Sequence, residues 1–206
     1  KRDVIYNQPI TDIGIANDTN RMVVSGLDGN VYIVSTTDFQ TIDNISFYRT
    51  PIIQKLNISA DGSLVGMSSV ARANSGRTNS MIWDIESRNI ITSLNISGSP
   101  PTAVGFSPTG NMAIFAYQLQ NQINIYDLVN GNQNGVIETF QDPMFDLSYS
   151  TENNSFLVSA VGTIGPKFKQ YFFTFPETDE SDGTFRIVNP IVEKKTIDLE
   201  DGYIFN

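Results

Sequence analysis

The sequence predicts an all-β protein built from four consecutive copies of one structural unit. Similar blocks open with a proline at residues 9, 51, 101 and 143, so that the spacings are 42, 50 and 42 residues. Short apolar runs bounded by turn residues recur in every block, and no long amphipathic stretch favours a helix. A repeat of about 40–45 residues is the length of one four-stranded propeller blade. We therefore expect a β-propeller of four-stranded antiparallel blades.

The proline blocks divide the single segment 1–206 into units. We assign the blades to residues 9–50, 51–100, 101–142 and 143–189, and a partial fifth blade to residues 190–206. A half blade leaves an open sheet edge, which proteins avoid, and closed propellers carry about four to eight blades. We therefore expect an incomplete ring, or a fragment of a larger propeller whose missing blades come from another segment or subunit.

Each unit repeats four strands in the same order. The first strand follows the proline, at Thr11–Ala16, Ile53–Ile58, Ala103–Phe106 and Phe145–Tyr149. After a hairpin turn, the second is expected at Met22–Ser25, Leu64–Ser68, Met112–Ala116 and Phe156–Ala160. The third is expected at Val31–Val34, Met81–Ile85, Gln122–Asp127 and Gln170–Phe175. A more polar fourth strand is expected at Thr41–Phe47, Asn89–Leu94, Gly135–Phe140 and Thr184–Val188.

Four aspartates mark turns. Asp28 and Asp61 each precede a glycine in a short polar stretch, whereas Asp84 and Asp127 end third strands. An aspartate side chain in a turn accepts hydrogen bonds from backbone amides a few residues further on. We therefore expect all four to stabilise turns rather than to bind a ligand.

Residues 103–111 read Ala-Val-Gly-Phe-Ser-Pro-Thr-Gly-Asn, which is similar to the Val-x-Phe-Ser-Pro-Asp-Gly stretch of WD40 repeats. Residues 25–33 resemble that family's Ser-Gly-x-Asp-Gly-x-Val segment, and Trp83-Asp84 matches the dipeptide that names it. The resemblance covers about residues 9–190 and implies a propeller that binds proteins, with no implied reaction. The family often carries a histidine in a buried hydrogen-bond tetrad, and this chain has no histidine with which to form one.

Composition excludes several kinds of site. The net charge is −9, from 22 acidic and 13 basic residues without a basic run, so we expect no nucleic-acid partner. The absence of Cys and His excludes disulfides, Cys/His zinc sites, Cys nucleophiles and Ser-His-Asp triads. No apolar run has the length of a membrane span. We expect no catalytic residue, no metal and no cofactor.

Two connections between second and third strands supply the candidate binding residues. The eight extra residues of the second unit fall in 69–79, which contains Arg72, Asn74 and Arg77. In a WD40-like propeller this connection lies on the face where partners dock, and an arginine can bind a carboxylate or phosphate with two hydrogen bonds. The fourth unit contributes Lys167 and Phe168 from the equivalent loop, 161–169. A solvated insertion without a binding role is the alternative for both.

An acidic run and the one tryptophan can each be interpreted as a binding feature or as a structural one. The acidic run 177–183 could attract a basic partner or a cation, but it lacks the EF-hand order and is also explained as a solvated loop. Trp83, the one tryptophan, is expected to pack between blades rather than to anchor an interface.

The expected function is therefore a rigid scaffold for protein partners inside a larger protein or complex, with a cytoplasmic location. Two alternatives stay open. A propeller enzyme of the lactonase or hydrolase type would need acids or amides converging from successive loops, whereas these loops carry mainly Arg, Lys, Asn and Ser. A secreted or surface bacterial repeat propeller that binds glycan or protein would suit the low charge and the many Asn, Ser and Thr residues.

Overall fold

The described part of the chain is all-β. The computed structural model describes residues 8–17, 19–46, 52–70, 78–95, 101–117, 121–129, 132–139, 144–150, 155–162, 165–174 and 191–197. Within these ranges the chain forms four antiparallel sheets of four strands each, and none of them contains a helix. We number the sheets 1 to 4 in chain order.

Each sheet is formed by four consecutive strands. Sheet 1 contains β1 (Ile10–Ile15), β2 (Arg21–Gly26), β3 (Asn30–Ser35) and β4 (Thr41–Ser46). Sheet 2 contains β5 (Ile52–Ile58), β6 (Leu64–Val70), β7 (Thr78–Asp84) and β8 (Asn89–Asn95). Sheet 3 contains β9 (Ala103–Phe106), β10 (Met112–Tyr117), β11 (Gln122–Asp127) and β12 (Asn132–Thr139). Sheet 4 contains β13 (Met144–Ser150), β14 (Ser155–Gly162), β15 (Gly165–Thr174) and β16 (Ile191–Ile197).

Strand order within every sheet follows the sequence, so each sheet is a simple meander. The turns between first and second strands have the backbone that their sequences predict. Gly62 and Gly110 adopt φ values of 71° and 69°, a region that glycine enters without steric cost. The backbone amide of each donates to the carbonyl of the residue three positions earlier, Ser59 and Ser107. These tight turns bring the two strands of each hairpin into register.

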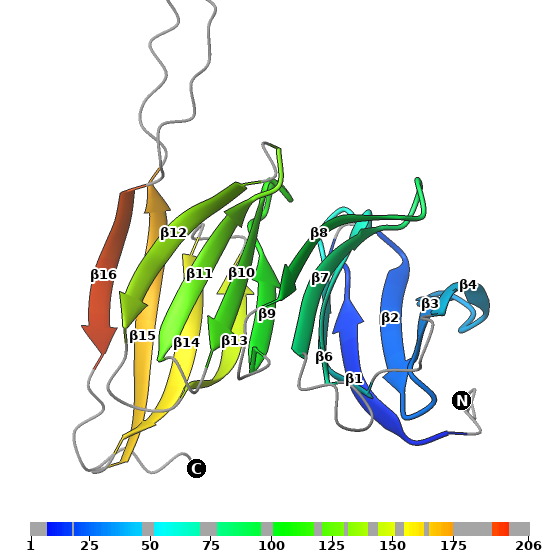
Figure 1. The fold of residues 1–206 in the computed structure, drawn as a ribbon, viewed down its shortest axis with the longest axis horizontal. Coiled ribbons are helices and arrows are strands. Elements are labelled where there is room, and N and C mark those ends of the chain that lie inside the picture. Colours follow the sequence, from blue (N-terminus) through cyan, green and yellow to red (C-terminus); the bar gives the residue numbers. More distant parts are fainter. Residues whose placement is uncertain are drawn as a thin grey trace, which may run out of the picture.

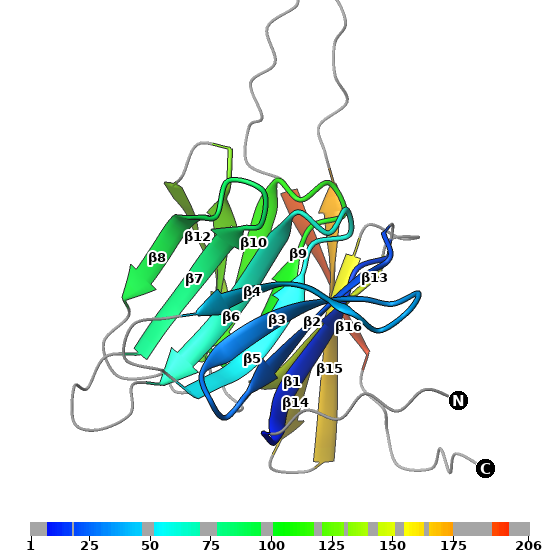
Figure 2. The ribbon, with the colours of Figure 1, turned by 90° about the vertical axis from the view of Figure 1, so that its right-hand side faces the viewer.

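The sheets are arranged in sequence order. Figure 1 shows sheet 1 at the right, sheet 2 beside it, and sheets 3 and 4 at the left with sheet 3 in front. The first strands β1, β5, β9 and β13 of successive sheets lie next to one another. Figure 2 looks onto the end of this arrangement, with β1 to β4 in front of β5 to β8.

An apolar core fills each space between successive sheets. Sheets 1 and 2 share one that includes Val23, Ile33, Leu56 and Met67, and the partly buried Trp83 packs against it. The core between sheets 2 and 3 consists of Leu64, Ile82, Val104, Phe106, Ala113, Phe115, Tyr117 and Tyr126. The core between sheets 3 and 4 consists of Ala103, Met112, Ile114, Ala116, Ile123, Ile125, Met144, Leu147, Phe156 and Val158. Burial of apolar surface between sheets therefore holds the arrangement together.

Glycines allow the sheets to approach closely. A Cβ at Gly14 of β1 would lie 3.0 Å from the Cα of Asn57 in β5. A Cβ at Gly66 of β6 would lie 2.6 Å from Cγ1 of Val104 in β9. Both distances are shorter than an ordinary van der Waals contact between carbons, so the sheet spacing depends on the missing side chains.

Hydrogen bonds also join the first strands of successive sheets. The Leu56 amide of β5 donates to Oδ2 of Asp12 in β1 at 2.8 Å. The Asn57 side-chain amide donates to the Val104 carbonyl of β9 at 3.0 Å. The Thr102 hydroxyl, just before β9, donates to the Met144 carbonyl of β13 at 3.1 Å. Each first strand is therefore fixed to the next by a side chain as well as by the apolar core.

The end of the chain differs from the expectation. We assigned 190–206 to a partial fifth blade, but β16 (Ile191–Ile197) pairs with β15 and is the fourth strand of sheet 4. The boundary at residue 189 is therefore wrong for residues 191–197, because the long hydrogen-bonded register with β15 takes this segment into the same sheet. The fourth strand predicted at 184–188, and the rest of the predicted partial blade, lie outside the described residues.

Candidate functional site

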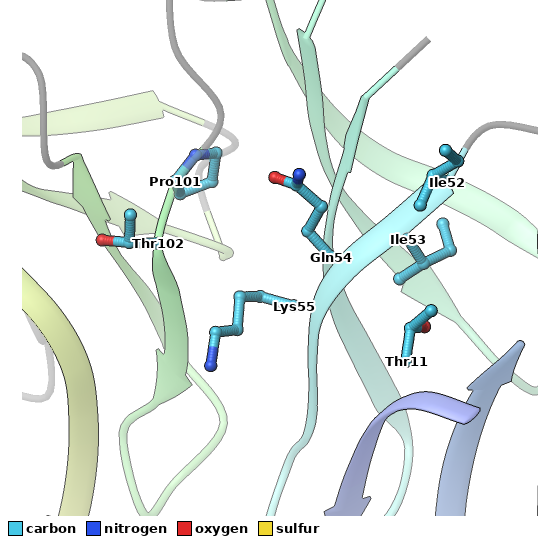
Figure 3. Close-up of a pocket in the computed structure, with 7 residues that line it drawn as sticks. All are labelled: Thr11, Ile52, Ile53, Gln54, Lys55, Pro101 and Thr102. Atoms are coloured by element: carbon cyan, nitrogen blue, oxygen red, sulfur yellow. The ribbon is translucent and has the colours of Figure 1, made fainter. Parts of the chain in front are cut away.

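A hollow of about 510 Å³ opens where the first strands of three sheets come together. Its lining residues are Thr11 of sheet 1, Ile52, Ile53, Gln54 and Lys55 of sheet 2, and Pro101 and Thr102 before β9 (Figure 3). Because β1 and β5 run antiparallel to the strands that follow them, this is the end of the sheets at which second strands connect to third strands. The hollow therefore opens on the side where we expected partners to dock.

Irregular pairing at the start of the first strands shapes the lining. The register of β5 against β6 shifts between Ile53 and Lys55, so that Gln54 has no ladder partner. The register of β1 against β2 shifts in the same way at Thr11. A bulge of this kind bends the strand and changes the direction of its side chains. Gln54 and Lys55 extend toward Pro101 and Thr102 across the hollow (Figure 3).

Hydrogen bonds hold the two hydroxyls of the lining. Thr11 Oγ1 lies 2.8 Å from the Ser25 hydroxyl and donates to the Ser25 carbonyl at 3.2 Å. Thr102 Oγ1 donates to the Ala116 and Met144 carbonyls. The lining thus offers an apolar surface, one flexible amide and one ammonium group. This combination suits an extended peptide that carries a carboxylate, because Lys55 supplies up to three charged donors.

The structure does not describe the binding residues predicted in the second unit, although it describes Val70 and Thr78 on either side of them. Arg72, Asn74 and Arg77 are outside the described residues. The connection that contains them begins after Val70, and Val70 pairs with the lining residue Ile52. The two ends of the connection, Val70 and Thr78, pair with each other. The connection therefore starts and ends at the rim of the hollow.

The placement predicted for Lys167 and Phe168 is wrong. We expected both in a loop at 161–169, but they lie within β15, where they pair with Ala160 and Ser159 of β14. The two strands continue to Gly162 and Gly165, which pair with each other, so the connection is much shorter than predicted. The glycines and the proline at 162–166 suggested a loop, although here they end a hairpin. The acidic run 177–183 lies outside the described residues.

The turn aspartates accept hydrogen bonds close to them in the sequence. Asp28 accepts from the Asn30 amide at 3.1 Å and from the Tyr32 hydroxyl at 2.6 Å. Asp61 accepts from the Ser59 hydroxyl at 2.6 Å and from the Ser63 amide at 3.0 Å.

The two aspartates that end third strands also accept hydrogen bonds from residues close to them in the sequence. Asp84 accepts from the Ser87 amide at 2.7 Å, and Asp127 accepts from the Val129 amide at 2.8 Å. Contacts of this type are those that turn-stabilising aspartates make.

Acid should destabilise the protein through two of these turns. Burial raises the pKa of Asp28 and Asp61, but hydrogen bonds from Tyr32, Ser59 and neighbouring groups outweigh it and hold each pKa below the usual value of an aspartate. A carboxyl whose pKa is lowered by folding stabilises the fold above its unfolded pKa of about 3.9, and this stability is lost as the pH falls through the folded pKa. We expect the urea concentration at the midpoint of unfolding to decrease when the pH is lowered below about 4. The decrease should be smaller in an Asp28→Asn/Asp61→Asn variant.

The control for this titration is Glu86→Gln, in the exposed β7–β8 turn. It should leave the pH dependence of the urea midpoint as in the wild type. Equal pH dependence in the wild type and the double variant would contradict the assignment of acid sensitivity to Asp28 and Asp61.

A second, smaller hollow of about 200 Å³ lies at the opposite end of the first strands. Residues from all four sheets line it, among them Asn17, Asn57, Ser107 and Ser148. The four first strands therefore surround a common space at this end. No group of three or more His, Cys, Asp or Glu residues suited to a metal ion occurs in the part of the chain that the structure describes.

Sequence reasoning missed Gln54 and Lys55. Both lie in the first strand of a unit, where the apolar pattern predicts a buried element and gives no reason to expect a site. The relevant signal is the bulge at Gln54, which depends on pairing with β6 and is not visible in the residue pattern.

No protein-family model matches the chain, and no curated protein matches its sequence. None of the described segments forms a helix with the length and apolar character needed to cross a membrane.

Proposed function

We propose that the four sheets are blades of a WD40-like β-propeller, and that this propeller is a rigid platform that binds a protein segment at the hollow around Lys55. Three features support the blade arrangement. Each sheet is a four-stranded meander, the first strands of successive sheets are neighbours, and an apolar core lies between each pair of successive sheets. Radial repetition of such sheets is the architecture of a propeller.

The observation that carries the binding proposal is the position of the hollow. It is lined by three different sheets and lies at the end from which the long connection 71–77 departs. A site formed by several sheets has a fixed shape, because the cores and hydrogen bonds between the sheets hold its walls.

The chemistry of the lining indicates the kind of segment that fits. Ile52 and Pro101 offer apolar contact, the Gln54 amide can pair with a peptide group, and Lys55 can bind a carboxylate. Because the chain as a whole carries a net charge of −9, a strongly acidic partner would be repelled at long range. A mostly neutral peptide segment with one carboxylate is therefore the favoured ligand.

The experiment compares three versions of the chain as bait in a cell extract, with quantitative mass spectrometry of the bound proteins. Lys55→Glu should lose a defined set of partners, because it opposes the ligand carboxylate with a second carboxylate. Arg88→Glu is the control, since it makes the same reversal of charge at a side chain that is 68% exposed, in the β7–β8 turn. Because Arg88 pairs with Asp43 at 2.6 Å, the fold of this variant is checked by circular dichroism before the comparison.

A purified partner should then bind the wild type and Arg88→Glu with equal affinity. The Kd for Lys55→Glu should be at least about tenfold weaker, corresponding to one lost charge-assisted hydrogen bond. If all three baits capture the same proteins to the same extent, the hollow is not the binding site.

A further inference from the structure

The space between sheets 2 and 3 is mostly apolar, but one part of it contains buried polar side chains. Ser80 of β7, Tyr117 of β10 and Asn124 of β11 are 2%, 1% and 3% exposed. The hydroxyl oxygens of Ser80 and Tyr117, which belong to different sheets, lie 3.5 Å apart. Asn124 is two residues from the core residue Tyr126 on β11, so its side chain leaves the face of sheet 3 that packs on sheet 2. We call Ser80, Tyr117 and Asn124 the polar cluster.

Strand register places Asn124 beside two tyrosine hydroxyls. Asn124 pairs with Phe115 of β10, so it lies between the residue pair that contains Tyr117 and the pair that contains Tyr126. Diagonal neighbours in an antiparallel pair are about 7–8 Å apart, which long and aromatic side chains can span. Burial is the main cause that raises the pKa of Tyr117 above its ordinary value, and the neighbouring Tyr126 raises it further. The Tyr117 hydroxyl therefore keeps its proton at neutral pH and lies close to Tyr126.

The amide oxygen of Asn124 lacks a hydrogen-bond donor. Oδ1 is buried, and none of the residues that the structure describes donates a hydrogen bond to it. Buried polar atoms of native proteins almost always have a partner, and where no protein group reaches them the partner is commonly an ordered water. The position of this oxygen therefore indicates a bound donor between the two sheets.

The other interfaces carry apolar residues at the positions of Ser80 and Asn124. The strand pairings make Ser80 equivalent to Val31 of sheet 1 and Ile123 of sheet 3, which are buried in the neighbouring cores. They make Asn124 equivalent to Met81 of sheet 2, which is buried in the core between sheets 1 and 2. The packing of one sheet on the next therefore does not require polar residues here. The two exceptions come from facing sheets, and Tyr117 connects them, since it contacts Ser80 and lies beside Asn124.

We propose that the polar cluster binds a water molecule, which donates one hydrogen bond to Oδ1 of Asn124 and bridges it to the hydroxyl of Tyr117. Water suits the site because it is neutral, as the three side chains are, and because a hydroxyl group can either donate to it or accept from it. Buried waters typically make about three hydrogen bonds, and the cluster offers one amide and two hydroxyls. The proposal does not use the hollow around Lys55, so the two can fail separately.

The number of long-lived internal waters can be counted by magnetic relaxation dispersion of the oxygen-17 signal of water. Asn124→Met removes the amide and introduces the residue that sheet 2 carries at the equivalent position. This variant should hold one internal water fewer than the wild type. Tyr32→Phe is the control, because it removes a hydroxyl that bonds to Asp28 in sheet 1, and it should hold as many as the wild type. An unchanged number in Asn124→Met would overturn the proposal.

Tyr117→Phe tests the second partner of the water and keeps the aromatic ring in the core. It removes only the hydroxyl that the water bridges to Asn124, so it should also hold one internal water fewer than the wild type. The same number as in the wild type would contradict the bridge to Tyr117, and with it the proposal. Because the two substitutions differ in shape, the test survives a failure of either variant to fold.

A crystal structure of the wild-type chain tests the location. We expect electron density for a water oxygen about 2.7–3.2 Å from Oδ1 of Asn124, within hydrogen-bond distance of the Tyr117 hydroxyl. The same density should be missing in crystals of Asn124→Met. A protein group that donates to Oδ1 at this place instead of a water would overturn the proposal.

Discussion

Phe115→Ala should destabilise the protein by about 3–5 kcal/mol, the usual cost of removing a buried aromatic ring from a core. Phe115 is 0% exposed and lies in the core between sheets 2 and 3. Its ring meets that of Tyr126 edge to face, with centroids 5.5 Å apart and planes inclined by 83°. The substitution removes this contact and leaves a cavity that two rigid sheets cannot easily close.

The measurement is equilibrium unfolding in urea, with Phe115→Leu and Phe39→Ala as comparisons. Leucine keeps most of the volume, so Phe115→Leu should cost less than about 1.5 kcal/mol. Phe39→Ala removes the same ring from a turn, where it is 38% exposed, and should have a much smaller effect than Phe115→Ala. A loss below about 1 kcal/mol for Phe115→Ala would mean that the core between sheets 2 and 3 contributes little to stability.

Gly66→Ala should destabilise the protein by about 1–3 kcal/mol through overpacking. The new methyl group would lie 2.6 Å from Cγ1 of Val104 and 3.0 Å from Cζ of Phe106, both on the facing sheet. Val104 is β-branched and has few rotamers through which to withdraw, so sheets 2 and 3 must separate locally. The loss of stability in Gly66→Ala should therefore arise from crowding between the two sheets, and not from a changed conformation of the β6 backbone.

A double-mutant cycle separates these two explanations. Val104→Ala removes the clashing methyl groups, so Gly66→Ala/Val104→Ala should be less destabilised than the sum of the single variants by about 0.5–3 kcal/mol. Gly66→Ala combined with Ile125→Ala, which changes the core between sheets 3 and 4, should be additive within about 0.5 kcal/mol. Additivity in the first pair would show that crowding against Val104 is not the cause.

Much of the fold could be predicted from the sequence because local chemistry determines it. The third strand predicted at Gln122–Asp127 has the bounds observed for β11, and the glycines at 62 and 110 mark the turns between first and second strands. Turn residues and alternating apolar positions act over a few neighbours, so they can be recognised in one sequence. The all-β class and the four-stranded units follow from these signals.

What could not be predicted depends on contacts between distant segments. The extension of β15 over Lys167 and Phe168 results from pairing with β14, and the placement of β16 results from pairing across a long connection. The hollow around Lys55 needs a bulge and three neighbouring sheets at once. The bond from the Leu56 amide to Asp12 likewise joins residues of different units, and no local pattern indicates it.

The contact of each sheet mainly with its neighbours has a consequence for how such a chain can evolve. One position of the first strand is glycine in two units, asparagine in another and serine in the fourth, at Gly14, Gly105, Asn57 and Ser148. A change at one of these positions has to be matched only by the adjoining unit, as the side chain of Leu147 fills the space beside Gly105. If such units arise by duplication, a substitution in one copy therefore has to be compensated only in the adjacent copy. The copies can then lose similarity to one another. The architecture persists although the units share few identical residues.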